Sequence, residues 1–125
     1  MTRLSFTPLM RDLILAGRKT GTTRKFTREH RKGSQVAAVC PEPGKPGFLI
    51  PAEQRFATLK ITGNHTVVPA RVAWRIYCME GFDSEQEYLN YLALINPNLS
   101  PLIECTFLEF EVLDHGLAKG EEKDV

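Results

Sequence analysis

The sequence lacks the features that mark membrane-spanning, disulfide-rich and metal-binding proteins. Its 125 residues contain no apolar run near the roughly 18 residues that a membrane-spanning helix needs. Residues 1–12 hold no long apolar segment of the secretory type. The cysteines, Cys40, Cys78 and Cys105, form no CxxC pair, and the three histidines are far apart, which argues against a disulfide framework or a zinc site. We therefore expect a cytoplasmic protein with reduced thiols, no membrane contact, no metal and no other cofactor.

Net charge is also small, at +1, but the charges are unevenly distributed along the chain. Residues 1–32 contain nine Lys or Arg and two acidic residues, a net charge of +7. The remaining 93 residues contain seven cations and thirteen acids, a net charge of −6. A basic segment of this kind is typical of proteins that bind a phosphate-bearing partner. A solvated cationic loop would give the same pattern, so charge alone leaves the partner open.

The apolar pattern predicts one domain of class α+β, because short strands alternate with a few helices around what can be one core. The segment from 69 to 79 fits either a helix or a strand, and we favour a strand that ends near Val68 and is followed by a helix. A turn is expected at Gly63-Asn64. Strands are expected over residues 4–6, 20–24, 36–40, 57–61 and 105–113, helices over 8–16 and 83–95, and loops over 25–33 and 41–48. The domain then covers residues 1–113, and residues 114–125 form a loose acidic tail.

Local signals predict where the two clearer helices begin and end. Thr7 before Pro8 is typical of an N-cap followed by a first-turn proline. Gly17 favours the left-handed conformation that ends a helix. The second helix is preceded by a Ser84–Glu87 capping box.

The stretch LAGRKTGTTR, residues 15–24, places three groups suited to acid–base chemistry at the end of the first helix. A desolvated lysine at position 19 could take the proton of the threonine hydroxyl at position 22. Arg24 could bind a carboxylate or phosphate, or stabilise an oxyanion. A helix end followed by a threonine-rich strand would use the same residues, and spacing alone favours that structural explanation.

The same stretch resembles the signature of the ASCH domain family. The family pattern is a Gly, any residue, Lys, two residues, Thr or Glu, any residue and Arg, which here falls on Gly17, Lys19, Thr22 and Arg24. The turn at 80–82 before the second helix is a further similarity, and the resemblance covers about residues 3–113. It implies a PUA-like small mixed β-barrel of about five or six strands with two or three helices.

The resemblance implies two alternative functions for one polar cleft. As a binding module, the domain would hold RNA or a modified nucleoside between Lys19, Thr22, Arg24 and Glu80. As an enzyme of the branch that hydrolyses N(4)-acetylcytidine, it would use Lys19 as base, Thr22 as nucleophile and Glu80 as acid. Further contacts to the ligand are expected from Arg18, Arg28, Arg31, Lys32 and Phe26.

Three more aromatic residues, Phe48, Trp74 and Phe82, are candidates for stacking on bases. For Trp74 a core position is favoured, because lone aromatic residues in small domains are usually buried. Both functional alternatives depend on one geometric expectation. The ammonium of Lys19, the hydroxyl of Thr22 and the guanidinium of Arg24 should converge, open to water, on a shared concavity. The sequence does not predict an oligomeric state.

Overall fold

A curled five-stranded sheet forms the framework of the domain in the computed structural model, which describes residues 1–42, 44–95 and 100–115, apart from the side chain of Phe48. Its strand order is β1-β3-β4-β5-β2. The pair of β1 with β3 is parallel, and the other pairs are antiparallel. The strands are β1 (Thr2–Ser5), β2 (Gly21–Lys25), β3 (Gln35–Val39), β4 (Ala57–Val67) and β5 (Cys105–Asp114).

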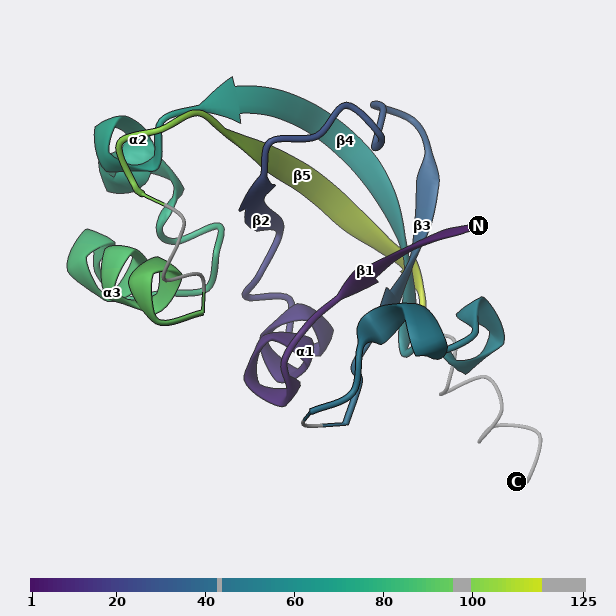
Figure 1. Cartoon of the computed structure of the whole chain (residues 1–125). Helices are drawn as coiled ribbons and strands as arrows, with labels where there is room; N and C mark the ends of the chain where they lie inside the picture. The colour runs from purple at the N-terminus through teal and green to yellow at the C-terminus, as the bar shows by residue number, and fades with distance from the viewer. Residues whose placement is uncertain (43, 96–99, 116–125) are drawn as a thin grey trace.

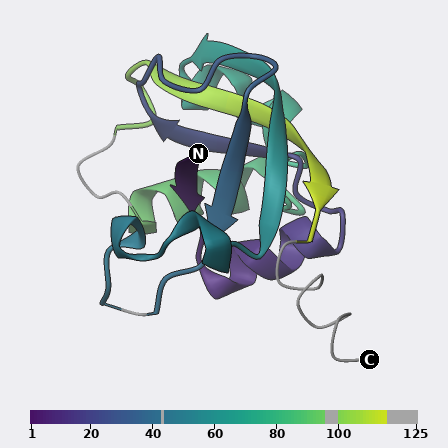
Figure 2. The ribbon, with the colours of Figure 1, turned by 90° about the vertical axis from the view of Figure 1, so that its right-hand side faces the viewer.

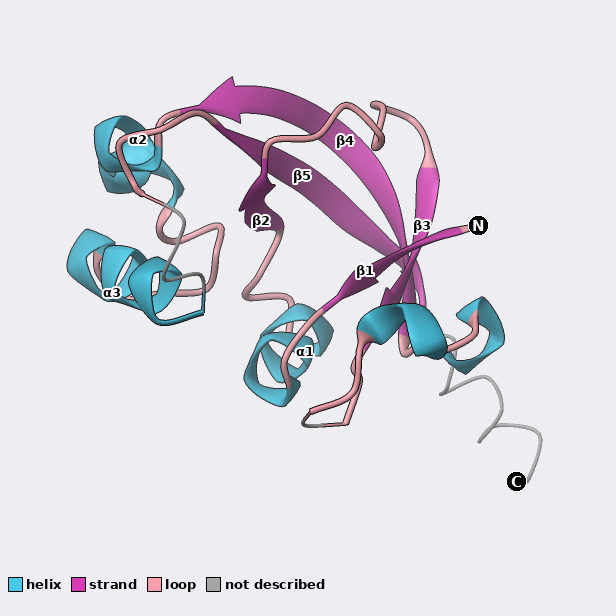
Figure 3. Ribbon diagram, in the orientation of Figure 1, coloured by secondary structure: helices cyan, strands magenta, loops and turns pink. Residues whose placement is uncertain are grey.

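Three α-helices lie against this half-barrel within the described residues (Figures 1 and 3). They are α1 (Pro8–Leu15), α2 (Pro69–Ile76) and α3 (Glu85–Ile95), and the short 3-10 helices η1 (Gly47–Leu49) and η2 (Ala52–Gln54) lie in the loop before β4. The expected α+β fold of about five or six strands with two or three helices is confirmed, and the curled sheet is consistent with a PUA-like barrel. The prediction that a strand ends near Val68 and is followed by a helix is also confirmed, because β4 ends at Val67 and α2 begins at Pro69.

The two edges of the sheet, β1 and β2, are joined by α1, as the rotated view shows (Figure 2). No strand lies between them in the described order, so the half-barrel has an opening there. Arg24 on β2 bridges this opening, because its Nη2 donates a hydrogen bond of 2.7 Å to the backbone oxygen of Ser5 on β1. The strand that contains the last four residues of the LAGRKTGTTR stretch therefore borders the seam of the barrel.

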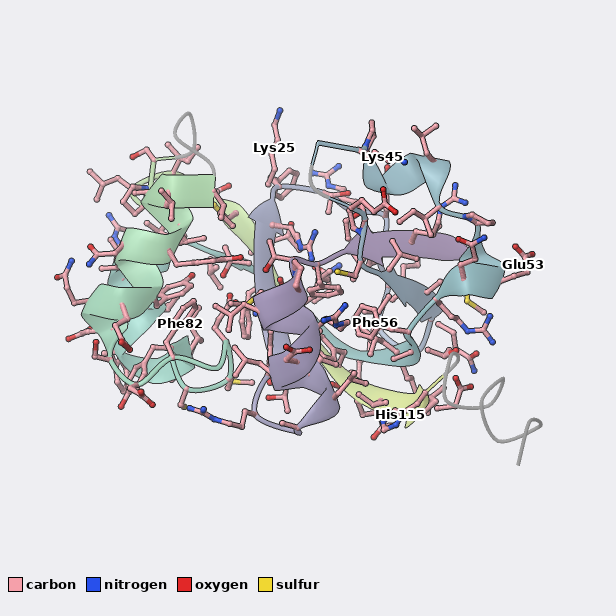
Figure 4. All side chains as sticks on the ribbon, turned by 90° about the horizontal axis from the view of Figure 1, so that it is seen from below. Lys25, Lys45, Glu53, Phe56, Phe82 and His115 are labelled. Atoms are coloured by element: carbon pink, nitrogen blue, oxygen red, sulfur yellow. The ribbon has the colours of Figure 1, made fainter. Side chains whose placement is uncertain are left out.

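Two apolar clusters fill the molecule on either side of this region. The larger lies inside the curled sheet and includes Phe6, Ile14 and Leu108. The smaller lies between the sheet and the helices α2 and α3 and includes Tyr88 and Phe107. Phe82 packs against both clusters, and Figure 4 shows it between α3 and α1. Polar residues between two such clusters are shielded from water.

The signals for the helix ends are confirmed. Thr7 Oγ1 accepts a hydrogen bond from the backbone N–H of Met10, and Gly17 has φ +78°. Ser84 Oγ accepts a hydrogen bond from the backbone N–H of Glu87. The Glu87 carboxylate accepts one from the backbone N–H of Asp83. Residues 96–99, which follow the predicted second helix, and residues 116–125 of the predicted tail lie outside the described residues. The tail was predicted to start at residue 114, but Asp114 still belongs to β5.

Two other predictions were wrong. Gly63-Asn64 is not a turn: β4 continues through it, with a register shift between Ile61 and Gly63 that indicates a bulge. Glycine inside a strand is typical of such a bulge, where one strand carries an extra residue. Trp74 is not a core residue, since it is 66 % exposed on the outer face of α2. The apolar face of α2 is formed instead by Ala73 and Ile76.

Candidate functional site

A buried ion pair joins Lys19 to Glu80. The Lys19 Nζ atom donates to Glu80 Oε1 at 2.6 Å and to the Glu80 backbone oxygen at 3.2 Å. The two residues are only 2 % and 4 % exposed. The backbone N–H groups of Thr20 and Gly21 both donate to the oxygen of Met79, so the backbone itself holds the two segments side by side. The sequence motif and the turn at Glu80 therefore form one site, as the resemblance implied.

The second oxygen of Glu80 binds Thr23, a residue that the motif did not point to. Thr23 Oγ1 donates to Glu80 Oε2 at 2.6 Å and also lies 2.6 Å from the hydroxyl of Tyr88. A hydroxyl carries one proton. Since Thr23 gives its proton to Glu80, Tyr88 must donate to Thr23. The result is a continuous chain of hydrogen bonds from Tyr88 through Thr23 and Glu80 to Lys19.

A cavity of about 130 Å³ opens beside this chain at the seam of the barrel. Arg24 is held across it: its Nε donates to Thr22 Oγ1 at 3.2 Å, and its guanidinium lies 4.7 Å from the centre of the Phe6 ring. The wall thus offers a guanidinium, hydroxyls and a carboxylate within a small volume. The cavity is lined by Ser5, Phe6, Thr7, Met10, Thr22, Thr23, Arg24, Glu80, Tyr91, Leu92 and Ile95.

Burial shifts the protonation equilibria of the chain. Desolvation lowers the pKa of Lys19, the charge and hydrogen bond of Glu80 raise it, and Arg24 lowers it further. Loss of hydration is the largest of these effects. Burial raises the pKa of Tyr88, and the charge of Glu80 raises it further. Tyr88 therefore stays a neutral hydrogen-bond donor at physiological pH.

The structure brings together most of the predicted site but corrects its geometry. Thr22, Arg24 and Glu80 line the cavity. Lys19 does not, because Glu80 and the surrounding packing seal it from water, so the expectation that all three motif groups open onto one concavity was wrong for Lys19. Arg18 also lies elsewhere: it is exposed and forms an ion pair of 3.2 Å with Asp83.

The predicted phosphate-binding residues lie in a different place. Phe26, Arg28, Arg31 and Lys32 line a hollow of about 720 Å³ beside β4, together with Asn64 and other residues of that strand. This hollow shares no lining residue with the cavity. The sequence suggested one cleft for all these residues, but the structure separates a small polar cavity from an open basic surface.

Sequence reasoning missed several residues of the cavity region. Thr23 differs from Thr22 only in strand alternation, which places it on the face that packs against α3. The ring of Tyr88 belongs to the smaller apolar cluster, whereas its hydroxyl contacts Thr23. Ser5 contributes through its backbone oxygen, for which a side-chain pattern holds no signal.

Two further searches of the described part of the chain concern metals and membranes. No group of three His, Cys, Asp or Glu side chains is close enough there to hold a metal ion. None of the helices described there combines the length and apolar character needed to cross a membrane.

The fold is similar to that of solved ASCH proteins, although no protein-family model and no curated protein matches the chain. The ASCH protein of Zymomonas mobilis is 16 % identical over 90 % of this chain and 66 % of its own, with a TM-score of 0.61. The ASCH domain of Lactobacillus crispatus JV V101 is 11 % identical over 89 % and 79 %, with a TM-score of 0.61. Protein EF3133 of Enterococcus faecalis V583 is 16 % identical over 97 % and 81 %, with a TM-score of 0.66. This chain spans about two thirds of the Zymomonas protein.

Proposed function

We propose that this chain, which has the fold of the ASCH domain proteins, binds a nucleobase of RNA or of a modified nucleoside in the cavity at the seam of the barrel. The observation that carries the proposal is the pairing of fixed donors and acceptors on the cavity wall. Arg24 contacts Thr22, Lys19 and Thr23 hold Glu80, and the cavity wall includes Arg24, Thr22 and Glu80. The Watson–Crick edge of a base presents donors and acceptors side by side in the same way.

The size of the cavity favours a single base. A volume of about 130 Å³ leaves no room for a duplex, whose bases are stacked and paired. An unpaired base can leave its stack and enter a pocket edge first. Tyr91 lines the cavity and is half-buried, and its hydroxyl lies 3.5 Å from that of Thr7, so the wall near α1 and α3 is amphipathic. A base would therefore meet apolar atoms along its faces and polar atoms at its edge.

The polar wall is preorganised for such a ligand. Each group that would meet the base is already fixed by another hydrogen bond, Glu80 by Lys19 and Arg24 by Ser5. A fixed side chain loses little conformational entropy when the ligand binds. We therefore expect binding without a large rearrangement of the seam.

Calorimetric titration with cytidine, N(4)-acetylcytidine and uridine tests this function. Thr22→Val keeps the shape of the side chain and removes the hydroxyl that Arg24 contacts, so we expect it to weaken binding about tenfold or more. Thr20→Val is the matched control, because Thr20 is exposed two residues away and does not line the cavity. Equal binding by the two variants, or no binding of any of the three nucleosides to the wild type, would contradict the proposal.

An amidohydrolase is the second candidate, favoured by the lowered pKa of Lys19 and by its contact with a carboxylate on the cavity wall. In this reaction the Thr22 hydroxyl would attack the acetyl carbon of N(4)-acetylcytidine and lose its proton to the general base, Lys19. The carbon–nitrogen bond would break, and the leaving cytidine amine would take a proton. Water would then hydrolyse the acetyl-threonine and release acetate. Lys19 meets the cavity only through Glu80, which ranks this reaction second.

Acetate release separates the two candidates. Hydrolysis predicts turnover of N(4)-acetylcytidine by the wild type and by Thr20→Val, and none by Thr22→Val. Binding of the nucleoside without acetate release would support the binding module and exclude the hydrolase. Removing Lys19 alone is less informative, because the charge of Glu80 would be left buried without its partner.

A further inference from the structure

A second hollow, of about 560 Å³, lies where β4 passes into α2 (Figure 1). We call it the α2 hollow. It shares no lining residue with the cavity at the seam, so it goes beyond the function proposed for that cavity. Its volume is within the range of about 300–1,000 Å³ that small-molecule sites occupy. Its apolar lining residues are Val67, Val68, Val72, Ile76, Met79 and Phe107.

The apolar lining of the α2 hollow is only partly covered by the fold. Phe107 and Ile76 are buried, at 2 % and 3 % exposed. Val68, Val72 and Met79 are half-buried, so each leaves part of its apolar surface to water. Because Val72 and Ile76 are four positions apart on α2, they lie on the same side of the helix. The hollow therefore offers a continuous apolar floor that a ligand would remove from water.

Two arginines of α2, Arg71 and Arg75, also line this hollow, and both are exposed. Neither forms an ion pair with any residue that the structure describes. Like charges four positions apart destabilise a helix. Arg71 also lies in the first turn of α2, which contains no acidic residue and where the helix dipole disfavours a cation. An anion bound between the two guanidiniums would offset both effects.

The acidic residue that lines the α2 hollow does not neutralise these arginines. Glu109 lies on β5, and its Oε2 atom is 2.6 Å from Nε2 of His65 on β4. Its contact is therefore with the sheet side of the hollow and not with α2. The arginines of α2 stay available to an anion that enters from solvent, and the carboxylate opposite them already has a partner.

We propose that the α2 hollow binds a small amphiphilic anion, a molecule with an apolar tail and one carboxylate or phosphate head. The head lies against Arg71 and Arg75, because the planar guanidinium forms paired hydrogen bonds with both kinds of head. The tail covers Val72, Ile76 and Phe107. An apolar lining with a few polar groups that fix the orientation of the ligand is the usual composition of a small-molecule site.

Calorimetric titration with four probes, each kept below its micelle-forming concentration, tests the proposal. Octanoate and octyl phosphate carry the tail and one head each, and the tighter of the two identifies the head that the site takes. Octanamide keeps the tail without the charge, and acetate keeps the charge without the tail. Both should bind about tenfold or more weakly than octanoate. Octanoate binding should show a negative change in heat capacity, because apolar surface is buried.

Three variants assign the two parts of the ligand to the two parts of the hollow. Arg71→Gln and Arg75→Gln remove a charge at an exposed position, and each should weaken binding of the tighter anion about tenfold. Val72→Thr keeps the shape of the side chain but places a hydroxyl on the apolar floor, so it should weaken binding of octanoate and of octanamide alike. Arg31→Gln is the charge-matched control, because Arg31 is exposed and does not line the α2 hollow.

Four results would overturn the proposal. They are no binding of octanoate or octyl phosphate, equal binding of octanoate and octanamide, and equal weakening by Arg31→Gln and Arg71→Gln, which would reduce the contact to the general positive field. The fourth is a dimer that the Arg71 and Arg75 variants dissociate, which would make a second copy of the chain the occupant. These variants do not touch the cavity and should leave nucleoside titrations unaltered, so a failure here is told apart from a failure of the proposed function.

Discussion

The cavity at the seam and the cationic groove, the open surface formed by the hollows beside β4 and α2, contain similar residue types in opposite surroundings. In the cavity region, Lys19 and Glu80 are almost fully buried, and each of their charges is met by a fixed partner. In the groove, Arg71 and Arg75 are exposed, and His65 and Glu109 form a pair that water reaches. The same Coulomb attraction is strong in the first place and screened by water and salt in the second.

This difference in burial separates the charged residues that stabilise the fold from those that contribute little to its stability. Removing one partner in the buried region leaves a charge without hydration, which costs much of the stability of a small domain. Removing one cation from the groove changes stability little, because water replaces the lost contact. Mutations of the buried ion pair should therefore lower the free energy of unfolding much more than mutations of the exposed cations in the groove.

The largest expected effect is that of Lys19→Met. This change leaves the Glu80 carboxylate buried without its ammonium partner, and we expect the free energy of unfolding to fall by about 3–5 kcal/mol. Urea unfolding followed by circular dichroism measures it. Lys19→Met combined with Glu80→Gln removes both charges and should recover part of the loss.

Lys45→Met is the control for that experiment, because Lys45 forms an exposed ion pair with Glu42. It should cost less than about 1 kcal/mol. A similar cost for Lys19→Met and Lys45→Met would show that the buried pair does not differ energetically from a surface pair, and the comparison would fail.

Two glycines give the next test. A Cβ at Gly21 would lie 2.4 Å from Cζ of Phe107, a ring fixed in the smaller core. Gly21→Ala should therefore lower the free energy of unfolding by about 1–3 kcal/mol. The atoms that crowd Gly63 are instead the far ends of the Glu109 and His65 side chains, which can rotate away, so Gly63→Ala should cost about 0.5 kcal/mol or less.

A double variant checks the cause at Gly21. Phe107→Leu removes the ring atoms that a Cβ at Gly21 would meet. The double variant with Gly21→Ala should therefore lose less free energy of unfolding than the sum of the two single losses. Strict additivity would show that Phe107 is not what excludes a side chain there.

The sequence predicted those parts of the fold that depend on local signals. Thr7, Gly17 and Ser84 marked the helix ends because capping depends on a few neighbouring residues. Gly63 was misread, because a glycine in a turn and a glycine in a bulge look alike until the partner strand is known. Trp74 was misread because its exposure depends on what packs against α2, which no local pattern contains.

The candidate site was predictable in its members more than in its shape. Arg24, Thr22 and Glu80 line the cavity as the family resemblance implied. The sealing of Lys19 depends on how the turn at Met79 and Glu80 packs against β2, a contact between segments 61 positions apart. The same holds for the separation of Arg28 and Arg31 from the cavity, because the direction of a loop is set by what it lies against.

A smaller effect is expected from pH, through His30, a buried residue of the basic loop that follows β2. His30 is 6 % exposed, and its Nδ1 has no hydrogen-bond partner among the described residues. Burial lowers its pKa below the ordinary value of about 6.5, Glu29 raises it and Arg24 lowers it. The unfolded chain therefore binds this proton more readily. Stability should fall as pH drops below about 6.5, by at most about 1.4 kcal/mol per pH unit, and level off below the folded pKa.

Urea unfolding between pH 5 and pH 8, values that span the ordinary histidine pKa, measures this slope. His30→Gln should flatten it, because glutamine does not titrate. His65→Gln, at an exposed histidine of the groove, should leave the contribution of His30 in place. Equal slopes in the wild type and in His30→Gln would exclude His30 as the cause.

The smallest effect is expected from Arg18→Ala, which tests the boundary of the cavity. Arg18 was predicted to contact the ligand, but it forms an exposed ion pair with Asp83 and does not line the cavity. Such pairs contribute less than about 1 kcal/mol and weaken with salt, so Arg18→Ala and Asp83→Asn should cost similarly little in urea unfolding. Cytidine affinity should stay at the wild-type value in both. A clear loss of affinity in Arg18→Ala alone would mean that the ligand extends past the seam to the end of α1, because Asp83→Asn breaks the same ion pair and leaves the arginine free to bind.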